Sequence, residues 1–173
     1  MDKNSRVAII GAGPSGLSSA KHLLDEGITN LTIYEKAAEL GGIWRYSDNA
    51  DDEHATPMYK NLNTNVPAEC MGFIDFPLKT KTGSSFCGHG EILQYLKTYA
   101  AKFKIDDKIQ FSSKVENVEF SNDEWLITVN NEINTFDFVV LANGHFSTPD
   151  IPPCFNDNIF EGEIIHASAY RWG

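Results

Sequence analysis

The sequence predicts an α/β fold in which a parallel sheet carries a small antiparallel β-meander insertion. One reason is the apolar run Val7–Ile10, which passes directly into a glycine-rich turn and an amphipathic segment. A second predicted strand, Leu31–Tyr34, completes a strand-helix-strand unit. Further along, alternating segments within residues 114–137 precede the continuous apolar run Phe138–Leu141, which is typical of a parallel strand buried on both faces.

The opening unit contains glycines in the pattern G-x-G-x-x-G, at Gly11, Gly13 and Gly16. In a dinucleotide-binding turn the first glycine permits the tight turn, the second lets the backbone approach a pyrophosphate, and the third lets the helix pack closely on the strand. The diphosphate then rests on free N–H groups at the positive end of the helix. The context supports this interpretation, because the next segment has one apolar face and ends at Gly27. That face consists of Leu17, Ala20, Leu23 and Leu24.

Glu35 closes the second strand, about 20 residues after the glycines, where an acidic residue hydrogen-bonds the ribose of the adenosine half. Such a carboxylate repels a 2′-phosphate. The first ligand is therefore expected to be FAD or NAD(H) rather than NADP(H). The alternative interpretation of Glu35 is a solvated strand end.

The middle of the chain is predicted to be a long loop followed by a helix. Residues 36–88 show little periodicity but many glycine, asparagine, proline and aromatic residues, and so long a loop is usually functional. A packing helix is predicted from residue 91 to about residue 103. Its apolar face consists of Ile92, Leu93, Leu96, Tyr99 and Phe103.

The meander is predicted to lead back into the parallel sheet. Asn130 and Asn131 suit the φ > 0 positions of a hairpin turn. The run Phe138–Leu141 then stops at Ala142, Asn143 and Gly144, and small residues at this edge place the segment beside the first glycine turn, where open α/β sheets bind ligands. The predicted meander strands cover residues 114–120, 124–129 and 132–136.

Length, charge and hydropathy exclude several classes of protein. The 173 residues suffice for one ordinary core but are few for an enzyme that holds two dinucleotides. The net charge of −10 and the scattered lysines argue against a nucleic-acid partner. No apolar run approaches the roughly 20 residues of a membrane span, and the N-terminus lacks the apolar region of a signal peptide, so a cytoplasmic location is predicted.

The cysteines and histidines predict neither a disulfide relay nor a metal site. Cys70, Cys87 and Cys154 are odd in number and far apart, so each is expected to be a buried or half-buried reduced thiol. The absence of a C-x-x-C pair argues against a disulfide-reductase flavoprotein. His54 and His89 have no spaced metal partner and are expected to be solvated or turn-forming.

Residues 6–170 resemble the N-terminal part of the flavin-containing monooxygenases. The matching segments are residues 39–45 (Glu-Leu-Gly-Gly-Ile-Trp-Arg), 59–65 (Tyr-Lys-Asn-Leu-Asn-Thr-Asn) and 73–77 (Phe-Ile-Asp-Phe-Pro). The most specific segment fits F-x-G-x-x-x-H-x-x-x-[Y/F], a linker motif of the family. The related Baeyer–Villiger enzymes carry tryptophan in the last place, whereas Trp172 lies two positions too late here. The motif residues are Phe160, Gly162, His166 and Tyr170.

The resemblance implies a mechanism in which NADPH reduces FAD and O2 adds to form a C4a-hydroperoxyflavin. This species oxygenates soft nucleophiles such as tertiary amines and thioethers, so the partners are a small-molecule substrate and O2. Two alternatives remain open: a Baeyer–Villiger-type monooxygenase and a non-catalytic flavin-binding fragment. The sequence also allows a homo-oligomer.

The family motif further implies a catalytic role for Asn65, whose amide offers donors and an acceptor without adding a proton source. From the residues alone, Asn65 is more simply a cap of the turn before Val66 and Pro67, and Trp44 a packing residue. For His166 a structural hydrogen bond is favoured over a general-base role. The predicted cofactor-binding residues are Gly11, Gly13, Pro14, Ser15, Gly16, Glu35, Lys36, Gly42, Ile43, Trp44, Thr64, Asn65, Val66, Val115, Ala142 and Gly144.

The predicted organisation is an FAD-binding Rossmann-like domain over residues 1–150 and a linker over residues 151–173. The flavin-wrapping loop (36–88) and the meander (114–137) lie within the domain. Full-length family members carry a second glycine fingerprint for NADPH beyond the histidine motif, and this sequence contains none. The expectation is a true N-terminus at Met1 and a chain truncated at its C-terminus, without the NADPH domain.

Overall fold

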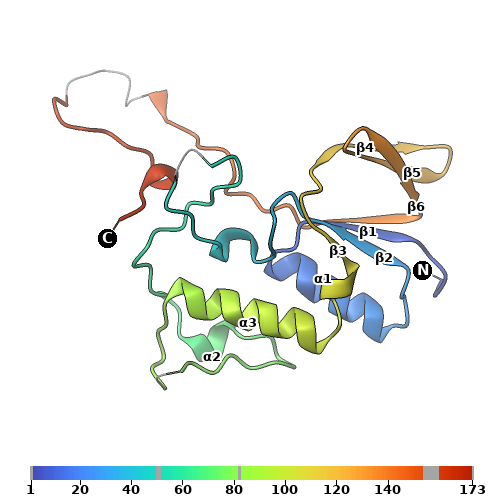
Figure 1. Cartoon of the computed structure of the whole chain (residues 1–173), viewed down its shortest axis with the longest axis horizontal. Coiled ribbons are helices and arrows are strands. Elements are labelled where there is room, and N and C mark those ends of the chain that lie inside the picture. Colours follow the sequence, from blue (N-terminus) through green and yellow to red (C-terminus); the bar gives the residue numbers. More distant parts are fainter. Residues whose placement is uncertain (1, 50–51, 82, 154–159, 173) are drawn as a thin grey trace.

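The computed structural model describes residues 2–49, 52–81, 83–153 and 160–172, which form three layers (Figure 1). Helices α1 (Pro14–Asp25) and α3 (His89–Lys102) cover one face of a parallel sheet, and an antiparallel sheet covers the other. This arrangement confirms the predicted α/β class. The other elements are β1 (Val7–Ile10), β2 (Leu31–Tyr34), η1 (Gly42–Trp44), α2 (Ala68–Met71), η2 (Asp106–Lys108), β3 (Ile109–Gln110), β4 (Val115–Ser121), β5 (Glu124–Val129), β6 (Glu132–Phe136), β7 (Phe138–Leu141) and η4 (Ala167–Ala169).

The parallel sheet has the strand order β3-β2-β1-β7 within the described residues. Val7 of β1 lies opposite Leu31 of β2 on one side and Phe138 of β7 on the other. The three predicted parallel strands are therefore confirmed, and they are adjacent. The short strand β3, which pairs with the end of β2, was not predicted.

Alternating side chains of the parallel strands build two separate cores. Val7 and Ile9 of β1 are fully buried against α1 and α3, whereas Ala8 between them packs against the antiparallel sheet. Tyr34 also points to the antiparallel side, where its ring centre lies 6.1 Å from that of Phe136. Side chains of a strand point alternately to opposite faces, so one short strand contributes to both cores.

The helix α3 begins two residues before its predicted start, at His89. Gly88 precedes it in an extended conformation, so the helical backbone starts directly after this glycine. His89, which was expected to be solvated or turn-forming, is instead the first residue of this helix. The predicted apolar face is confirmed, because Ile92, Leu96 and Tyr99 are buried in the core shared with α1.

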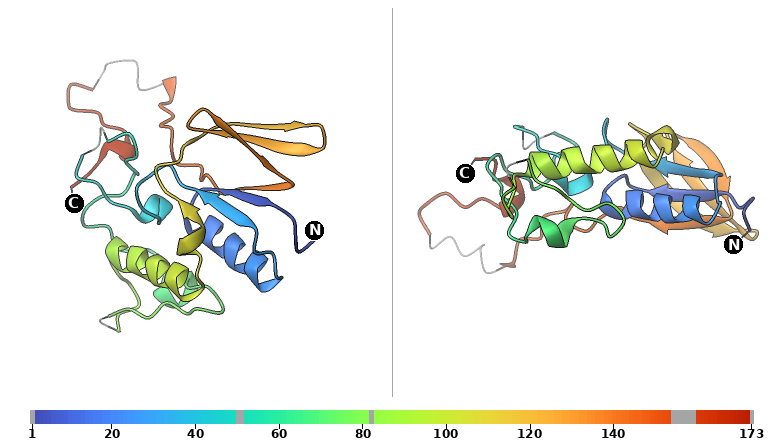
Figure 2. Two further views of the ribbon diagram at one scale, coloured as in Figure 1. Left: turned by 45° about the vertical axis from the view of Figure 1, so that its right-hand side comes forward. Right: turned by 90° about the horizontal axis from the view of Figure 1, so that it is seen from below.

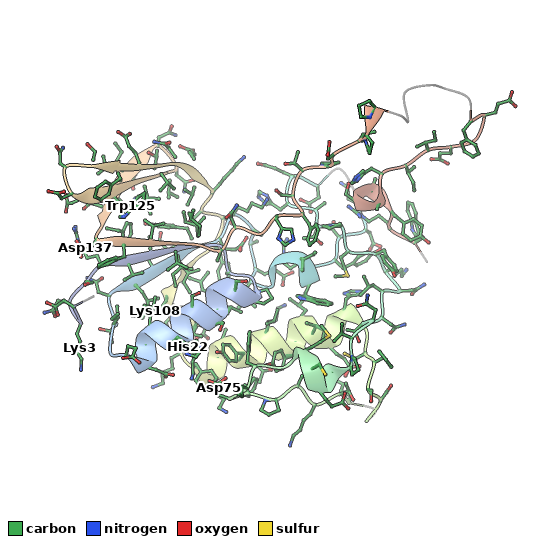
Figure 3. The ribbon with its side chains drawn as sticks, turned by 180° about the vertical axis from the view of Figure 1, so that it is seen from behind. Lys3, His22, Asp75, Lys108, Trp125 and Asp137 are labelled. Carbon is green, nitrogen blue, oxygen red and sulfur yellow. The ribbon has the colours of Figure 1, made fainter. Side chains whose placement is uncertain are left out.

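The antiparallel sheet has the order β4-β5-β6 and confirms the predicted meander. The bounds of β5 and β6 agree with the prediction, and β4 begins and ends one residue later. Asn130 and Asn131 form the hairpin turn between β5 and β6, and their φ values of 51° and 64° are those expected for it. Trp125 lies on this sheet, on the side of the molecule away from α3 (Figure 3).

The expectation that β7 is buried on both faces is only partly correct. Val139 contacts one core and Val140 the other, but Phe138 is 38% and Leu141 69% exposed. In the described part of the chain β7 is the edge strand of the sheet, so no neighbouring strand lies along its outer side. Beyond β7, residues 145–153 and 160–172 run away from the sheet and turn back at η4 (Figure 2).

Cysteine burial and membrane-spanning potential were also predicted. Cys87 is buried as expected, but Cys70 is exposed, because it lies on the outer side of the short helix α2. Cys154 lies outside the described residues. No helix in the described ranges combines the length and apolar character needed to cross a bilayer.

Candidate functional site

The glycine turn (residues 11–16) lies at the carboxyl edge of the parallel sheet, next to the end of β7. Gly11 has a φ of 105°, and a Cβ added to it would lie 2.5 Å from the carbonyl oxygen of Ala142. The predicted position of Ala142 beside this turn is thus confirmed. A Cβ on Gly16 would lie 1.9 Å from the Gly11 oxygen, so the helix packs directly on the turn. At Gly144 an added Cβ would meet nothing within 4 Å, so only the backbone φ of 73° favours glycine at this position.

The start of α1 is open to an anion. Gly13 precedes the helix in an extended conformation, Pro14 occupies its first turn, and no side chain of the described residues caps it. The first turn also holds no acidic residue. The partial positive charge of the helix start is therefore available to a bound diphosphate, and an exposed Ser15 leaves room beside it.

The loop that carries Gly42 lies against the glycine turn. Gly41 donates its N–H to the Ala12 oxygen over 3.0 Å. A Cβ on Gly42 would lie 2.9 Å from the Cα of Gly13, and Gly42 has a φ of 55°. The two glycine segments are therefore in backbone contact, and larger residues would separate them.

Glu35 is 6% exposed, which contradicts the interpretation as a solvated strand end. One carboxylate oxygen accepts a hydrogen bond from Ala12 N over 2.8 Å, and the other from Ala37 N over 2.9 Å. Because an ionised carboxylate has about four lone-pair sites, these bonds fix its orientation and leave acceptor capacity free. Glu35 is thus a pre-oriented acceptor beside the glycine turn.

A cavity of about 260 Å³ follows on from the Gly42 loop, and we refer to it as the Asn65 cavity. It brings together four predicted residues from two distant segments. A larger hollow of about 450 Å³ lies between α3 and residues 76–81 and contains none of the predicted residues. The Asn65 cavity is lined by Ile43, Trp44, Met58, Tyr59, Leu62, Asn63, Thr64, Asn65 and Met71.

Asn65 itself is exposed at the wall of this cavity. Within the described ranges its side chain forms no hydrogen bond, so it does not cap the turn before Val66 and Pro67. Its amide donors and acceptor are free for a ligand. Trp44 is half-buried and packs against the main core, as the packing interpretation predicts, and it also lines the cavity.

Hydrogen bonds with residues that do not line the cavity hold its walls in place. Thr64 N donates to the Cys87 oxygen over 2.9 Å, and Cys87 N donates to Thr64 Oγ1 over 3.3 Å. Burial raises the pKa of the Cys87 thiol, which keeps it protonated. The Thr56 hydroxyl donates to the carbonyl oxygens of Ile43 and Arg45, a contact that the sequence did not predict.

Several predicted residues lie apart from the cavity. Val115 packs against the core of the antiparallel sheet, and Lys36 and Val66 are exposed. His166 Nδ1 accepts from Ser168 N over 3.1 Å and lies 2.8 Å from Ser168 Oγ, so it caps η4 in the structural role that was favoured. The described residues contain no group of three metal-ligating side chains.

Comparisons with known proteins identify relatives over nearly the whole chain. The family model described as flavin-binding monooxygenase-like matches residues 4–172. The flavin-containing monooxygenase FMO GS-OX1 of Arabidopsis thaliana is 33% identical over 189 residues, covering 97% of this chain and 41% of the relative. Senecionine N-oxygenase of Tyria jacobaeae is 36% identical over 178 residues, covering 96% and 39%. The chain therefore spans about two fifths of the length of these relatives.

A solved structure supports the same relationship. The S-allyl-L-cysteine S-oxygenase of Allium sativum superposes with a TM-score of 0.83 at 32% identity, covering 97% of this chain and 43% of that one. The similarity of fold thus extends over nearly the whole chain.

Proposed function

Because this chain belongs to the flavin-binding monooxygenase-like family, we propose that it binds FAD and contributes to oxygenation of nitrogen or sulfur in small molecules. The observation that carries the proposal is the continuity of the site. Glu35 bonds to Ala12, the Ala12 turn contacts the Gly42 loop, and that loop enters the Asn65 cavity. An acceptor for a ribose, a cradle for a diphosphate and a cavity for a ring system thus follow one another in the order of a dinucleotide.

Each part of the site has a separate task in this proposal. The uncapped start of α1 and the bare backbone of Gly13 hold the diphosphate, and Glu35 accepts from the ribose hydroxyls. Trp44 and Thr64 border the ring system. The bound FAD supplies the redox chemistry, accepting a hydride and activating O2, and the protein orients the ring and restricts access of water.

Asn65 is our proposed catalytic residue. Its amide can hydrogen-bond both a polar ring edge and a second ligand, and it has no titratable proton. A carboxylic acid or an imidazolium at this place would offer a proton to a reactive oxygen species. An amide therefore orients the reacting groups without promoting a side reaction.

The substrate class follows from the relatives. One is named an N-oxygenase and another an S-oxygenase, which supports amines and thioethers as substrates. We propose NADPH as the reductant and O2 as the oxidant of the complete reaction. A non-catalytic flavin-binding module is the second candidate, because the chain spans only about two fifths of its curated relatives.

The test has two stages. FAD is titrated into the chain while flavin fluorescence is followed, and NADPH oxidation is then measured with a thioether, a tertiary amine or a cyclic ketone. FAD binding with thioether- or amine-stimulated oxidation supports the monooxygenase, and stimulation by the ketone alone supports a Baeyer–Villiger enzyme. FAD binding without substrate oxidation supports the flavin-binding module. Failure to bind FAD overturns the proposal.

A further inference from the structure

Among the residues that the structure describes, the largest fully buried side chain belongs to an arginine, Arg171, which is 2% exposed. Its Nη1 donates to the carbonyl oxygens of Ser168 over 2.8 Å and Tyr170 over 2.9 Å, and lies 3.5 Å from that of Met58. In the part of the chain that the structure describes, no carboxylate forms an ion pair with it. Arg171 is thus held by backbone carbonyl groups from two separate segments.

The segment that carries Arg171 lies along residues 58–60. Lys60 N donates to the Arg171 oxygen over 2.9 Å, and the ring centres of Tyr59 and Tyr170 lie 5.5 Å apart in an edge-to-face arrangement. Together with the Met58 contact, three successive residues of this loop face the segment. In Figure 2 the red segment around η4 accordingly lies beside the loop that follows η1.

Residues 58–65, which we call the wall loop, form most of one side of the Asn65 cavity. One end is fixed by Thr64 and Cys87, and Asn63 forms a bridge to Gly88 just before α3. Arg171 lies at the other end of this loop. The wall loop is therefore held at two places, of which only the first belongs to the Rossmann-like core.

A buried arginine is a costly way to fill space. Arg171 Nε is buried without a hydrogen-bond partner among the described residues, and a buried charge without a carboxylate is unfavourable. An apolar side chain would avoid both costs. The planar guanidinium, however, presents five N–H donors in a fixed fork, whereas a lysine has three donors on one flexible, strongly hydrated nitrogen and an apolar side chain has none.

We propose that Arg171 is a positioning residue that fixes the wall loop and thereby sets the place of Asn65 in the cavity. The consequence for flavin binding rests on the proposed function, whereas the effect on the loop does not. The residue acts through the backbone of residues 58–60 and has no direct contact with a ligand.

The first test is hydrogen–deuterium exchange of the free chain, read by mass spectrometry. Arg171→Met is expected to raise exchange of amides in the wall loop about tenfold, the effect of losing one hydrogen bond to a charged donor. Exchange in β1 and α1 is expected to stay unchanged. Arg171→Lys keeps the charge but lacks the planar fork, so it should resemble Arg171→Met. The matched control is Trp172→Ala, because the neighbouring Trp172 is 67% exposed.

The second test is FAD titration with the same variants, with iodide quenching of the bound flavin as a spectroscopic readout. Arg171→Met is expected to bind FAD about tenfold more weakly and to expose the ring to iodide. Unchanged exchange in the wall loop overturns the proposal. A rise in exchange throughout β1 and α1 also overturns it, because it would mean that Arg171 stabilises the whole fold rather than the wall loop. Full protection in Arg171→Lys also overturns it. A local rise in a chain that binds no FAD would retain Arg171 as an anchor and refute the proposed function instead.

Discussion

Gly13→Ala separates flavin binding from folding. Gly13 has a φ of −80°, which any residue adopts, and an added Cβ would lie 3.5 Å from the Cα of Gly42, an ordinary contact. Alanine is a poorer N-cap than glycine by about 0.5–1 kcal/mol, but it stabilises the protein by about 0.4–1 kcal/mol because it restricts the unfolded chain. The two effects nearly cancel, so Tm should move by less than about 4 °C.

The same methyl group would stand where the diphosphate has to approach the backbone. Extra atoms in a closely packed contact cost about 1–3 kcal/mol. FAD should therefore bind about 5- to 150-fold more weakly to Gly13→Ala than to the wild-type chain. The assay is quenching of flavin fluorescence, with Tm measured on the same samples by tryptophan fluorescence.

Two further glycine variants complete this experiment. Gly16→Ala places its Cβ 1.9 Å from the Gly11 oxygen, so it should lower Tm strongly, with loss of FAD binding as a by-product. Gly90→Ala lies in α3, meets nothing within 4 Å, and should leave FAD binding unchanged. The reasoning is refuted if Gly13→Ala binds FAD as tightly as the wild type, or if it unfolds like Gly16→Ala.

Three further predictions concern single side chains. Glu35→Gln replaces a charged acceptor of two backbone N–H groups, so the free energy of unfolding should fall by about 1.5–3 kcal/mol. Urea titrations measure this change, and a free energy equal to that of the wild type would contradict the two hydrogen bonds. Iodoacetamide should label exposed Cys70 well before buried Cys87, as peptide mapping would show; the reverse order would place Cys87 at the surface. The Arg6 guanidinium, which donates to Asp137, lowers the pKa of this carboxyl group. The carboxylate therefore stabilises the fold above its ordinary pKa of 3.8 and loses that effect as pH falls through its lower folded pKa. Asp137→Asn should therefore have a lower Tm than the wild type at pH 7 and an equal one at strongly acidic pH, and a constant difference would contradict the ion pair.

The parts of the fold that the sequence predicted well are those with local causes. The strand Val7–Ile10 is continuously apolar and Leu31–Tyr34 is mostly apolar, and the turn at Asn130 and Asn131 requires residues that tolerate positive φ. The glycine turn was also predictable, because its spacing reflects backbone geometry within six residues. Each of these features depends on neighbours in the sequence.

Features that depend on distant contacts could not be predicted in this way. Thr56 holds the Ile43 loop through its hydroxyl, and nothing in the surrounding sequence indicates this partner. The burial of Arg171 involves the carbonyl oxygen of Met58, which lies 113 residues away in the sequence. The strand Ile109–Gln110 is too short for a detectable alternation, and it exists because β2 offers a free edge.

The candidate site was predicted in its parts but not in its connections. The residues around Asn65 were identified through family resemblance, since an asparagine before a valine and a proline indicates only a turn. The burial of Glu35 and the contact between Gly13 and Gly42 became visible only with the fold. The free side-chain amide of Asn65 is likewise a property of the folded chain.

The edge position of β7 has a consequence for handling the protein. The structure describes no strand on the outer side of β7, so the outward backbone groups of this strand form a template for a further strand, flanked by exposed Phe138 and Leu141. Such an apolar edge promotes self-association at high concentration. Natural sheets protect their edges with charged side chains, and a lysine in place of Leu141 would provide the same protection against aggregation.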